Sequence, residues 1–146
     1  MQKINSQLEQ AIQLSKKGWS IIPLHGIENG ICTCSKKDRC TSPGKHPRVS
    51  SWLEFQKRQA SLKEIKNWWI KWPNSNIGVV TGKISGLVIA DFDGEEGMKS
   101  SKKLLFEGKL KQSLIAVTGN GLHFYYGYSG KHSIKNSVSL HAKKMD

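Results

Sequence analysis

The sequence lacks a long apolar segment, has few acidic residues, and carries an odd number of cysteines. No run of about 18 apolar residues occurs, so we expect no membrane-spanning helix. Residues 1–5 lack the apolar core of a signal sequence. The three cysteines lie within nine positions, which argues against a disulfide framework and predicts a reduced, cytoplasmic location.

The shortage of acidic residues leaves the chain strongly basic. Eleven Asp and Glu stand against 23 Lys and Arg in 146 residues, which gives a formal net charge of +12. Such an excess favours an anionic partner, most commonly the backbone of a nucleic acid. The alternative is a solvated surface that only keeps the protein soluble.

The chain is organised around residues 86–93, Gly-Leu-Val-Ile-Ala-Asp-Phe-Asp, which Gly94 follows. The apolar run bounded by glycines predicts a buried strand. Side chains on a strand alternate, so Asp91 and Asp93 share a face and lie roughly 6–7 Å apart along it. A divalent cation, magnesium or manganese, suits such a pair of carboxylates. The alternative is that the two residues merely begin a turn at Gly94.

Residues 25–50 have no periodic apolar pattern and contain four potential metal ligands in the order C-x-C-x5-C-x5-H. These are Cys32, Cys34, Cys40 and His46. Thiolates and imidazole are the ligands of tetrahedral zinc, and a metal stabilises an insertion too irregular to form a core. We therefore predict a structural zinc rather than a basic loop with incidental cysteines. A catalytic zinc is disfavoured because four protein ligands close the site.

The rest of the chain alternates helix and strand patterns. We expect helices over residues 5–17, 61–71 and 97–108, and strands over residues 19–24, 76–80, 114–117 and 122–128. Ser61 and Glu64 form a capping-box pattern. The tryptophans near residue 69 fit core packing better than base stacking. The pattern over 76–93 predicts a hairpin whose loop carries Gly82 and Lys83 beside the carboxylates.

A second hairpin carries a histidine after a Gly-containing turn. Thr118-Gly-Asn-Gly121 predicts the turn, and His123 follows on the next strand. Alternation puts His123 and Tyr125 on one face and the other aromatic residues on the opposite, packed face. The alternative is a surface histidine bonded to backbone.

In this order, the motifs resemble the N-terminal catalytic domain of the bifunctional primase-polymerases, which are related to archaeo-eukaryotic primases. The similarity begins at Gly18-Trp19 and continues through Gly44-Lys-His-Pro47 and Thr81-Gly82. It then includes Asp91-Phe-Asp93 and ends with Thr118-Gly-Asn-Gly-Leu-His123. The resemblance implies an α+β fold with an RRM-like core. It also implies one primase-polymerase-like domain over residues 1–146, with a zinc-binding insertion at 25–50.

The resemblance also implies a function. Such a domain synthesises and extends primers on a DNA template from NTP or dNTP, by a two-metal mechanism, in a plasmid, phage or mobile element. By analogy, Asp91 and Asp93 bind catalytic Mg2+ or Mn2+, and Zn2+ is structural. Asp146 falls near the expected third carboxylate. The resemblance implies that His123 contacts the triphosphate of the incoming nucleotide. To His123 we add Gly82, Lys83 and Gly121 as nucleotide-binding candidates of our own.

The expected third carboxylate lies at the last residue of the sequence, so we expect a domain that is incomplete at its C-terminus. Family members often continue into a helicase domain, which is then a possible partner in a longer protein. The main alternative is a non-catalytic zinc-stabilised DNA-binding module, or an inactive fragment of a primase-helicase. A metal-dependent nuclease with His123 as a ligand ranks last.

Overall fold

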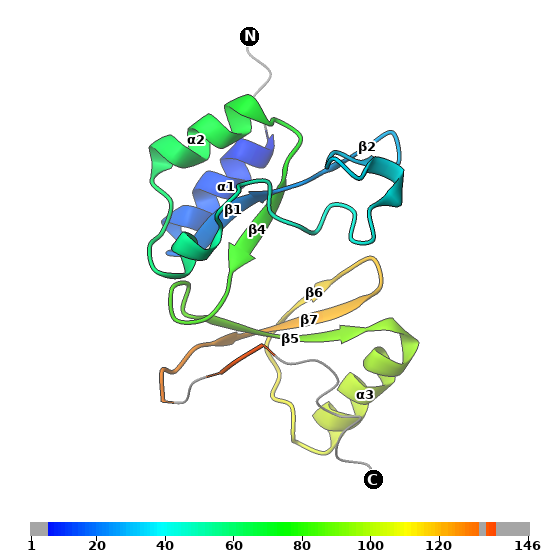
Figure 1. The fold of residues 1–146 in the computed structure, drawn as a ribbon. Helices are drawn as coiled ribbons and strands as arrows, with labels where there is room; N and C mark the ends of the chain where they lie inside the picture. Colours follow the sequence, from blue (N-terminus) through cyan, green and yellow to red (C-terminus); the bar gives the residue numbers. More distant parts are fainter. Residues whose placement is uncertain (1–5, 132–133, 137–146) are drawn as a thin grey trace.

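The computed structural model describes residues 6–131 and 134–136, and Figure 1 shows its elements in two groups. The first group contains α1 (Ser6–Lys16), β1 (Ser20–Leu24), α2 (Leu62–Lys71) and β4 (Asn76–Val80). The second contains β5 (Leu87–Asp93), α3 (Gly94–Phe106), β6 (Leu114–Val117) and β7 (Gly121–Gly127). The segment between β1 and α2 forms β2 (Ile27–Glu28), β3 (Ile31–Cys32) and the short 3-10 helices η1 (Lys37–Arg39) and η2 (Leu53–Gln56). The predicted mixed α+β fold is confirmed, whereas the RRM-like arrangement stays a prediction.

The first group forms the main core. Strands β1 and β4 pair antiparallel, with Ser20 opposite Val80 and Leu24 opposite Asn76. Helices α1 and α2 contact each other and β1, and Ile21, Ile65 and Trp69 are at most 1% exposed where they meet. Since apolar area removed from water is the main stabilising term, this helix-on-sheet contact fixes the first group.

The second helix begins and packs as its sequence predicts. The Ser61 hydroxyl accepts a hydrogen bond from the Glu64 backbone N–H at 3.2 Å, and the Glu64 carboxylate accepts from the Ser61 N–H at 2.8 Å. Trp69 is 1% exposed, and its indole N–H donates to the Ser75 carbonyl oxygen at 3.2 Å. Core packing of Trp69 is thus confirmed, whereas Trp68 and Trp72 are only half-buried.

The second group is a three-stranded antiparallel sheet in the order β5-β7-β6, with α3 packed against β5 and β7. Phe92 and Phe124 meet edge to face at 5.5 Å between ring centroids, and Phe124 is 1% exposed. The Asp91 side chain on the other face is 52% exposed. Helix α3 therefore covers the aromatic face and leaves the carboxylate face open.

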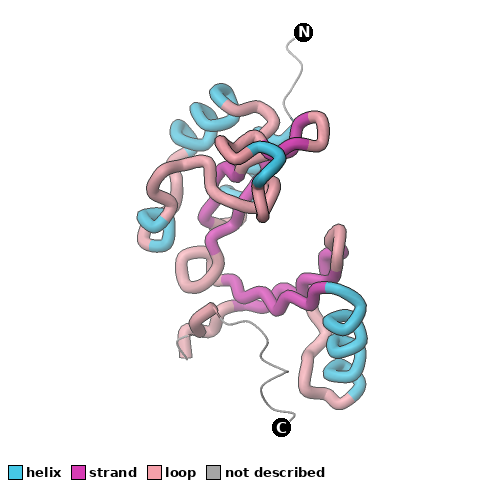
Figure 2. The backbone as a smooth tube through the Cα atoms, turned by 45° about the vertical axis from the view of Figure 1, so that its right-hand side comes forward, coloured by secondary structure: helices cyan, strands magenta, loops and turns pink. Residues whose placement is uncertain are grey.

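The predicted hairpin over residues 76–93 is wrong. Strand β4 pairs with β1, and β5 pairs with β7, so the two strands belong to different sheets. Only a bridge between Gly82 and Leu87 joins them at the connection, where Gly82 and Gly86 have φ of +92° and +58°. A glycine turn is compatible with a hairpin, but here it directs the chain from one group to the other (Figure 2).

One expectation falls on a residue that the structure does not describe, because Asp146 lies outside the described residues. Within the part of the chain that is described, no helix is both long and apolar enough to cross a bilayer.

Candidate functional site

The open face of the second sheet brings a carboxylate and an imidazole together. Asp91 on β5 lies directly opposite His123 on β7. The Nε2 atom of His123 lies 3.3 Å from Oδ1 of Asp91, and the two side chains are 32% and 52% exposed. The sequence predicted both residues on strand faces, and the strand pairing places them in contact.

Asp93 lies one row further along the same face, at the point where β5 ends and α3 begins. It stands opposite Gly121 and precedes the first residue of α3. Gly94 has φ +70°, and its N–H donates to the Asn120 carbonyl oxygen at 2.7 Å. Gly94 thus has the positive φ that the turn alternative expected, but it begins α3, and Asp91 and Asp93 both lie within β5. Asp93 is exposed and shares the strand face with Asp91, as predicted.

Gly121 has a structural reason to be glycine. A Cβ there would overlap the backbone carbonyl oxygen of Phe92 on the neighbouring strand. The close approach of β7 to the end of β5 keeps the Asn120 turn beside Asp93. The predicted contact of Gly121 with a nucleotide stays a prediction.

Two aromatic residues extend the open face away from the carboxylates. Tyr125 follows His123 on the same face of β7, with 6.4 Å between their ring centroids. Trp19, just before β1, stacks on Tyr125 at 6.4 Å with an angle of 11° between the rings. The open face is therefore turned toward the first group of elements. Sequence reasoning placed Tyr125 on this face but could not find Trp19, since their contact spans the two groups.

The structure does not bring Gly82 and Lys83 beside the carboxylates. Gly82 bridges Leu87, at the opposite end of β5 from Asp93. Four residues of extended strand separate Leu87 from Asp91, which is roughly 13 Å. The loop predicted to contact the nucleotide thus lies beyond Tyr125 on the sheet rather than next to Asp91.

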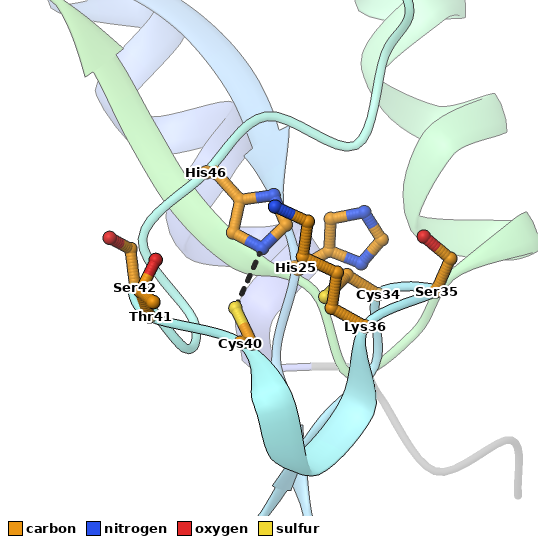
Figure 3. Close-up of a pocket in the computed structure, with 8 residues that line it drawn as sticks. All are labelled: His25, Cys34, Ser35, Lys36, Cys40, Thr41, Ser42 and His46. Atoms are coloured by element: carbon orange, nitrogen blue, oxygen red, sulfur yellow. Dashed lines mark hydrogen bonds between the residues drawn. The ribbon is translucent and has the colours of Figure 1, made fainter.

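The four predicted zinc ligands gather in one cluster between β3 and the segment after η1. The ligand atoms of Cys32, Cys34, Cys40 and His46 all lie within 4.8 Å of one another. Nε2 of His46 lies 3.6 Å from Sγ of Cys32 and 3.4 Å from Sγ of Cys40. Figure 3 shows His46 reaching Cys40, with His25 against the His46 ring at 4.7 Å between centroids.

The spacing of these atoms fits a tetrahedral metal ion. With bonds of about 2.3 Å to sulfur and 2.0–2.1 Å to nitrogen, tetrahedral zinc separates sulfur from nitrogen by about 3.6 Å. Cys32 and Cys34 are 3% and 6% exposed, as expected for a closed structural site. The donor set and geometry are thus compatible with structural zinc.

Local electrostatics favour a thiolate at one ligand. Burial alone raises the pKa of Cys32, but hydrogen bonds from the Gly44 and Cys34 backbone and from His46 outweigh it and lower that pKa to about 6. Burial and the neighbouring sulfurs raise the pKa of Cys40. Burial, followed by electrostatic interaction with Arg48 and with His46, lowers the pKa of His25, which favours a neutral imidazole beside the cluster.

His25 was not identified as part of this environment from the sequence, whereas Arg48 was visible among the basic residues around the cysteines. The backbone N–H of His25 donates to the His46 carbonyl oxygen at 2.9 Å, and the backbone N–H of Arg48 donates to the Pro23 carbonyl oxygen at 2.9 Å. Residues 46–48 thus run antiparallel along β1, which fixes His46 in the cluster. The sequence did not reveal this pairing.

Comparison with known proteins gives one family match. A family model described as bifunctional DNA primase/polymerase, N-terminal, matches residues 11–146. Neither the curated proteins nor the solved structures contain a significant match.

Proposed function

The chain belongs to the family of bifunctional DNA primase/polymerase N-terminal domains, and on this premise we propose that it transfers nucleotides to a primer on a DNA template. The family implies a DNA primase/polymerase type of function, with DNA and nucleotides as substrates. The proposal adds the site, the catalytic cations and the role of zinc. It also retains the RRM-like core and the single domain over residues 1–146, with its insertion at 25–50.

The observation that carries the proposal is the pairing of Asp91 with His123 on the open face of the sheet. Their side chains lie 3.3 Å apart and stay partly exposed, and Asp93 adds a second carboxylate in the next row. Exposed carboxylates beside a histidine provide both anionic ligands for cations and a hydrogen-bond donor for phosphate. Transfer of a nucleotidyl group from a nucleoside triphosphate to a primer hydroxyl, with pyrophosphate as the leaving group, uses this combination.

Each residue has a separate task in the proposed reaction. Asp91 and Asp93 would hold the catalytic cations, because magnesium and manganese prefer negatively charged oxygen ligands such as carboxylates. Magnesium or manganese bound there supplies the charge that activates the primer hydroxyl and stabilises the leaving pyrophosphate. His123 donates from Nε2 to a phosphate oxygen of the incoming nucleotide, in place of its contact with Asp91. Gly121 keeps the turn close enough for the triphosphate to lie against its backbone.

Nucleotide binding is the sharpest test of this site. We expect calorimetric titration with a deoxynucleoside triphosphate and manganese to show binding that Asp91→Asn and Asp93→Asn each weaken at least tenfold. The same substitutions should abolish manganese- or magnesium-dependent incorporation into a primed DNA template. His123→Ala should weaken nucleotide binding, since it removes the phosphate donor.

Helix α3 supplies a matched control. Glu95 and Glu96 are exposed carboxylates in its first turn, and both pair with Lys99 at 3.0 Å. Glu95→Gln with Glu96→Gln removes two negative charges close to Asp93 without touching the open face. If this double variant loses as much nucleotide binding as Asp91→Asn, the effect is one of net charge and the proposed site is wrong.

The zinc cluster has a structural task in this proposal. We expect the purified protein to contain one zinc per chain, and Cys34→Ser to release it. Chelation should make the segment from β3 to His46 sensitive to trypsin at its exposed lysines. The α1–α2 core should stay resistant, because that core does not use the cluster. A zinc-free protein with unchanged proteolysis would contradict this role.

A non-catalytic, zinc-stabilised DNA-binding module is the second candidate. It is favoured by the Cys3His cluster and by the net charge of +12. This candidate predicts salt-sensitive DNA binding that Asp91→Asn leaves unchanged, together with no nucleotide binding by the wild-type protein.

A further inference from the structure

A hollow beside α2, in the first group of elements, combines tryptophans with an arginine. It has a volume of about 420 Å³ and lies between α2, η2 and the segment that follows the zinc cluster. Trp68 and Trp72 line it from α2, and Phe55 forms part of it from η2. Arg48, Ser50 and Ser51 line it from the other side.

The two tryptophans are not fully used by the core. Trp68 meets Phe55 edge to face at 5.3 Å, at an angle of 86°, and Trp72 follows it by one helical turn. Both are half-buried, in contrast to the buried Trp69 between them in sequence. Both indoles line the hollow, Trp68 from the last turn of α2 and Trp72 from the residue that directly follows the helix.

Two cations lie over the ring of Trp72. The guanidinium carbon of Arg48 lies 5.3 Å from the centre of a Trp72 ring, and Nζ of Lys71 lies 4.7 Å from it. Arg48 also donates to the Ser75 hydroxyl at 3.2 Å, which holds it in place.

One arginine pairs with both carboxylates in the hollow. Arg58 pairs with Glu54 at 2.7 Å and with Glu64 at 2.8 Å, and it lies over the Phe55 ring at 4.7 Å. Two carboxylates and one guanidinium leave this cluster with a net negative charge. An approaching phosphate is therefore attracted to the Arg48 end of the hollow and repelled from the Glu54–Glu64 end.

One segment contributes both to this hollow, through Arg48, and to the Cys3His cluster, through His46. Leu24 and Pro47 form an antiparallel bridge, so residues 46–48 are extended along β1. His46 and Arg48 then point to the same side of this segment. His46 lines a second hollow of about 470 Å³ together with Lys36, Ser42 and His25 (Figure 3). A chain of phosphates can pass from one hollow to the other along one face.

We propose that this hollow is a single-stranded DNA subsite, in which Trp68 and Trp72 stack a base and Arg48 binds the adjacent phosphate. The inference rests on the proposed function, which requires a DNA template, but it assigns template contact to a surface away from Asp91 and His123. Base stacking on tryptophan is tolerant of sequence, because every base has an aromatic face. The DNA on one side of the stacked base then runs toward Lys36, which lies next to the Cys3His cluster.

The test measures the affinity of the zinc-loaded protein for a fluorescein-labelled single-stranded oligodeoxynucleotide by anisotropy. We expect Trp72→Leu and Trp68→Leu each to weaken binding about tenfold, since one base stack is lost. Trp72→Tyr, which keeps an aromatic face, should retain most of the affinity. Arg48→Gln should weaken binding, and the charge-matched control Lys102→Gln, at an exposed position of α3, should leave it nearly unchanged.

Photocrosslinking locates the contact independently. An oligonucleotide containing 5-iodouracil should crosslink to Trp68 or Trp72. Crosslinks confined to Trp19 and Tyr125, or unchanged affinity in both leucine variants with unchanged thermal melting, would overturn the inference.

The proposed active site and the proposed single-stranded DNA subsite can be tested independently of each other. Asp91→Asn should lose nucleotide binding and keep its affinity for single-stranded DNA. If Asp91→Asn behaves so while the tryptophan variants bind DNA normally, the subsite is wrong and the proposed function stands. If the tryptophan variants lose DNA affinity while Asp91→Asn still binds nucleotide normally, the subsite stands and the proposed active site is wrong.

Discussion

At the scale of single residues, the open face depends on backbone that leaves no room for a side chain. Gly121 lies where β7 crosses closest to the end of β5, and a Cβ there would overlap the Phe92 carbonyl oxygen. Gly97 in α3 is similar, because its Cβ would lie 2.8 Å from the Phe92 carbonyl carbon. These two glycines let the turn and the helix close around the point where Asp93 leaves the sheet.

Gly121→Ala should therefore destabilise the protein. Since the added methyl group meets rigid backbone rather than a flexible side chain, we expect a loss of about 2–4 kcal/mol in the free energy of unfolding. Gly119→Ala in the same turn is the control, since nothing lies within 4 Å of its Cβ. Urea denaturation followed by circular dichroism measures both. Equal stability of the two variants would contradict the close approach.

At the scale of elements, α2 is held by an ion cluster as well as by its apolar face. Glu64 closes the capping box with Ser61 and pairs with Arg58, which also binds Glu54. The Arg58 hydrogen bond, followed by the Ser61 backbone, lowers the pKa of Glu64 to about 2 from 4.5. A carboxylate with a depressed pKa stabilises the folded state above its unfolded pKa, and this stabilisation disappears as the pH falls toward the folded value.

Glu64→Gln isolates this charge, because a glutamine oxygen can still accept from the Ser61 N–H. Since the Glu64 side chain is 34% exposed, solvent screening reduces the expected loss near pH 7 to about 1 kcal/mol. The difference from wild type should shrink as the pH falls from 4.5 to 2. Glu9→Gln, in the exposed first turn of α1, should cost only a few tenths of a kcal/mol. Thermal melts across this pH range measure the stability difference between each variant and wild type. If Glu64→Gln is still less stable than wild type by the same amount at pH 2, the loss does not come from the ion pair of Glu64 with Arg58.

The same scale shows what sequence patterns can and cannot predict. Helix α2 and strands β4 and β6 lie within a residue or so of their predicted bounds, because capping residues and alternation are local signals. The partner of β4 was mispredicted because a glycine turn is compatible with both a hairpin and a crossing between sheets. Pairing depends on which apolar faces meet, and that is a tertiary property.

In the candidate site, too, the residue types could be predicted from the sequence but their contacts could not. The residue types at Asp91, Asp93, His123 and the Cys3His cluster were recognisable, since their spacing carries the chemistry. The contact of Asp91 with His123, the stacking of Trp19 on Tyr125 and the distance of Lys83 from the carboxylates required the register of β5 against β7. No local pattern determines that register.

At the scale of the whole molecule, the charge is distributed unevenly with respect to the site. Residues 32–46 form the zinc-stabilised element of our proposal. They carry Lys36, Lys37, Arg39 and Lys45 against Asp38, and all five of these side chains are exposed. In Figures 1 and 2 this element and the β6–β7 turn lie on the same side of the molecule. Lys102 and Lys103 are also exposed, but on α3, which covers the opposite face of the sheet. Equal numbers of charges can therefore be removed from the two regions.

If the zinc-stabilised element contacts DNA, removing its charges must change the salt dependence of DNA affinity more than removing the same number of charges from α3. Each phosphate neutralised on a single strand contributes about −0.7 to the slope of log affinity against log salt concentration. We expect Lys36→Gln with Lys45→Gln to reduce the magnitude of this slope by about 1.4, because two phosphate contacts are lost. Lys102→Gln with Lys103→Gln lowers the net charge equally and should leave the slope nearly unchanged. Anisotropy titrations between about 50 and 200 mM salt resolve the difference. Equal slopes in the two double variants would mean that DNA responds to the total charge of the protein, and the template path across the zinc-stabilised element would have to be abandoned.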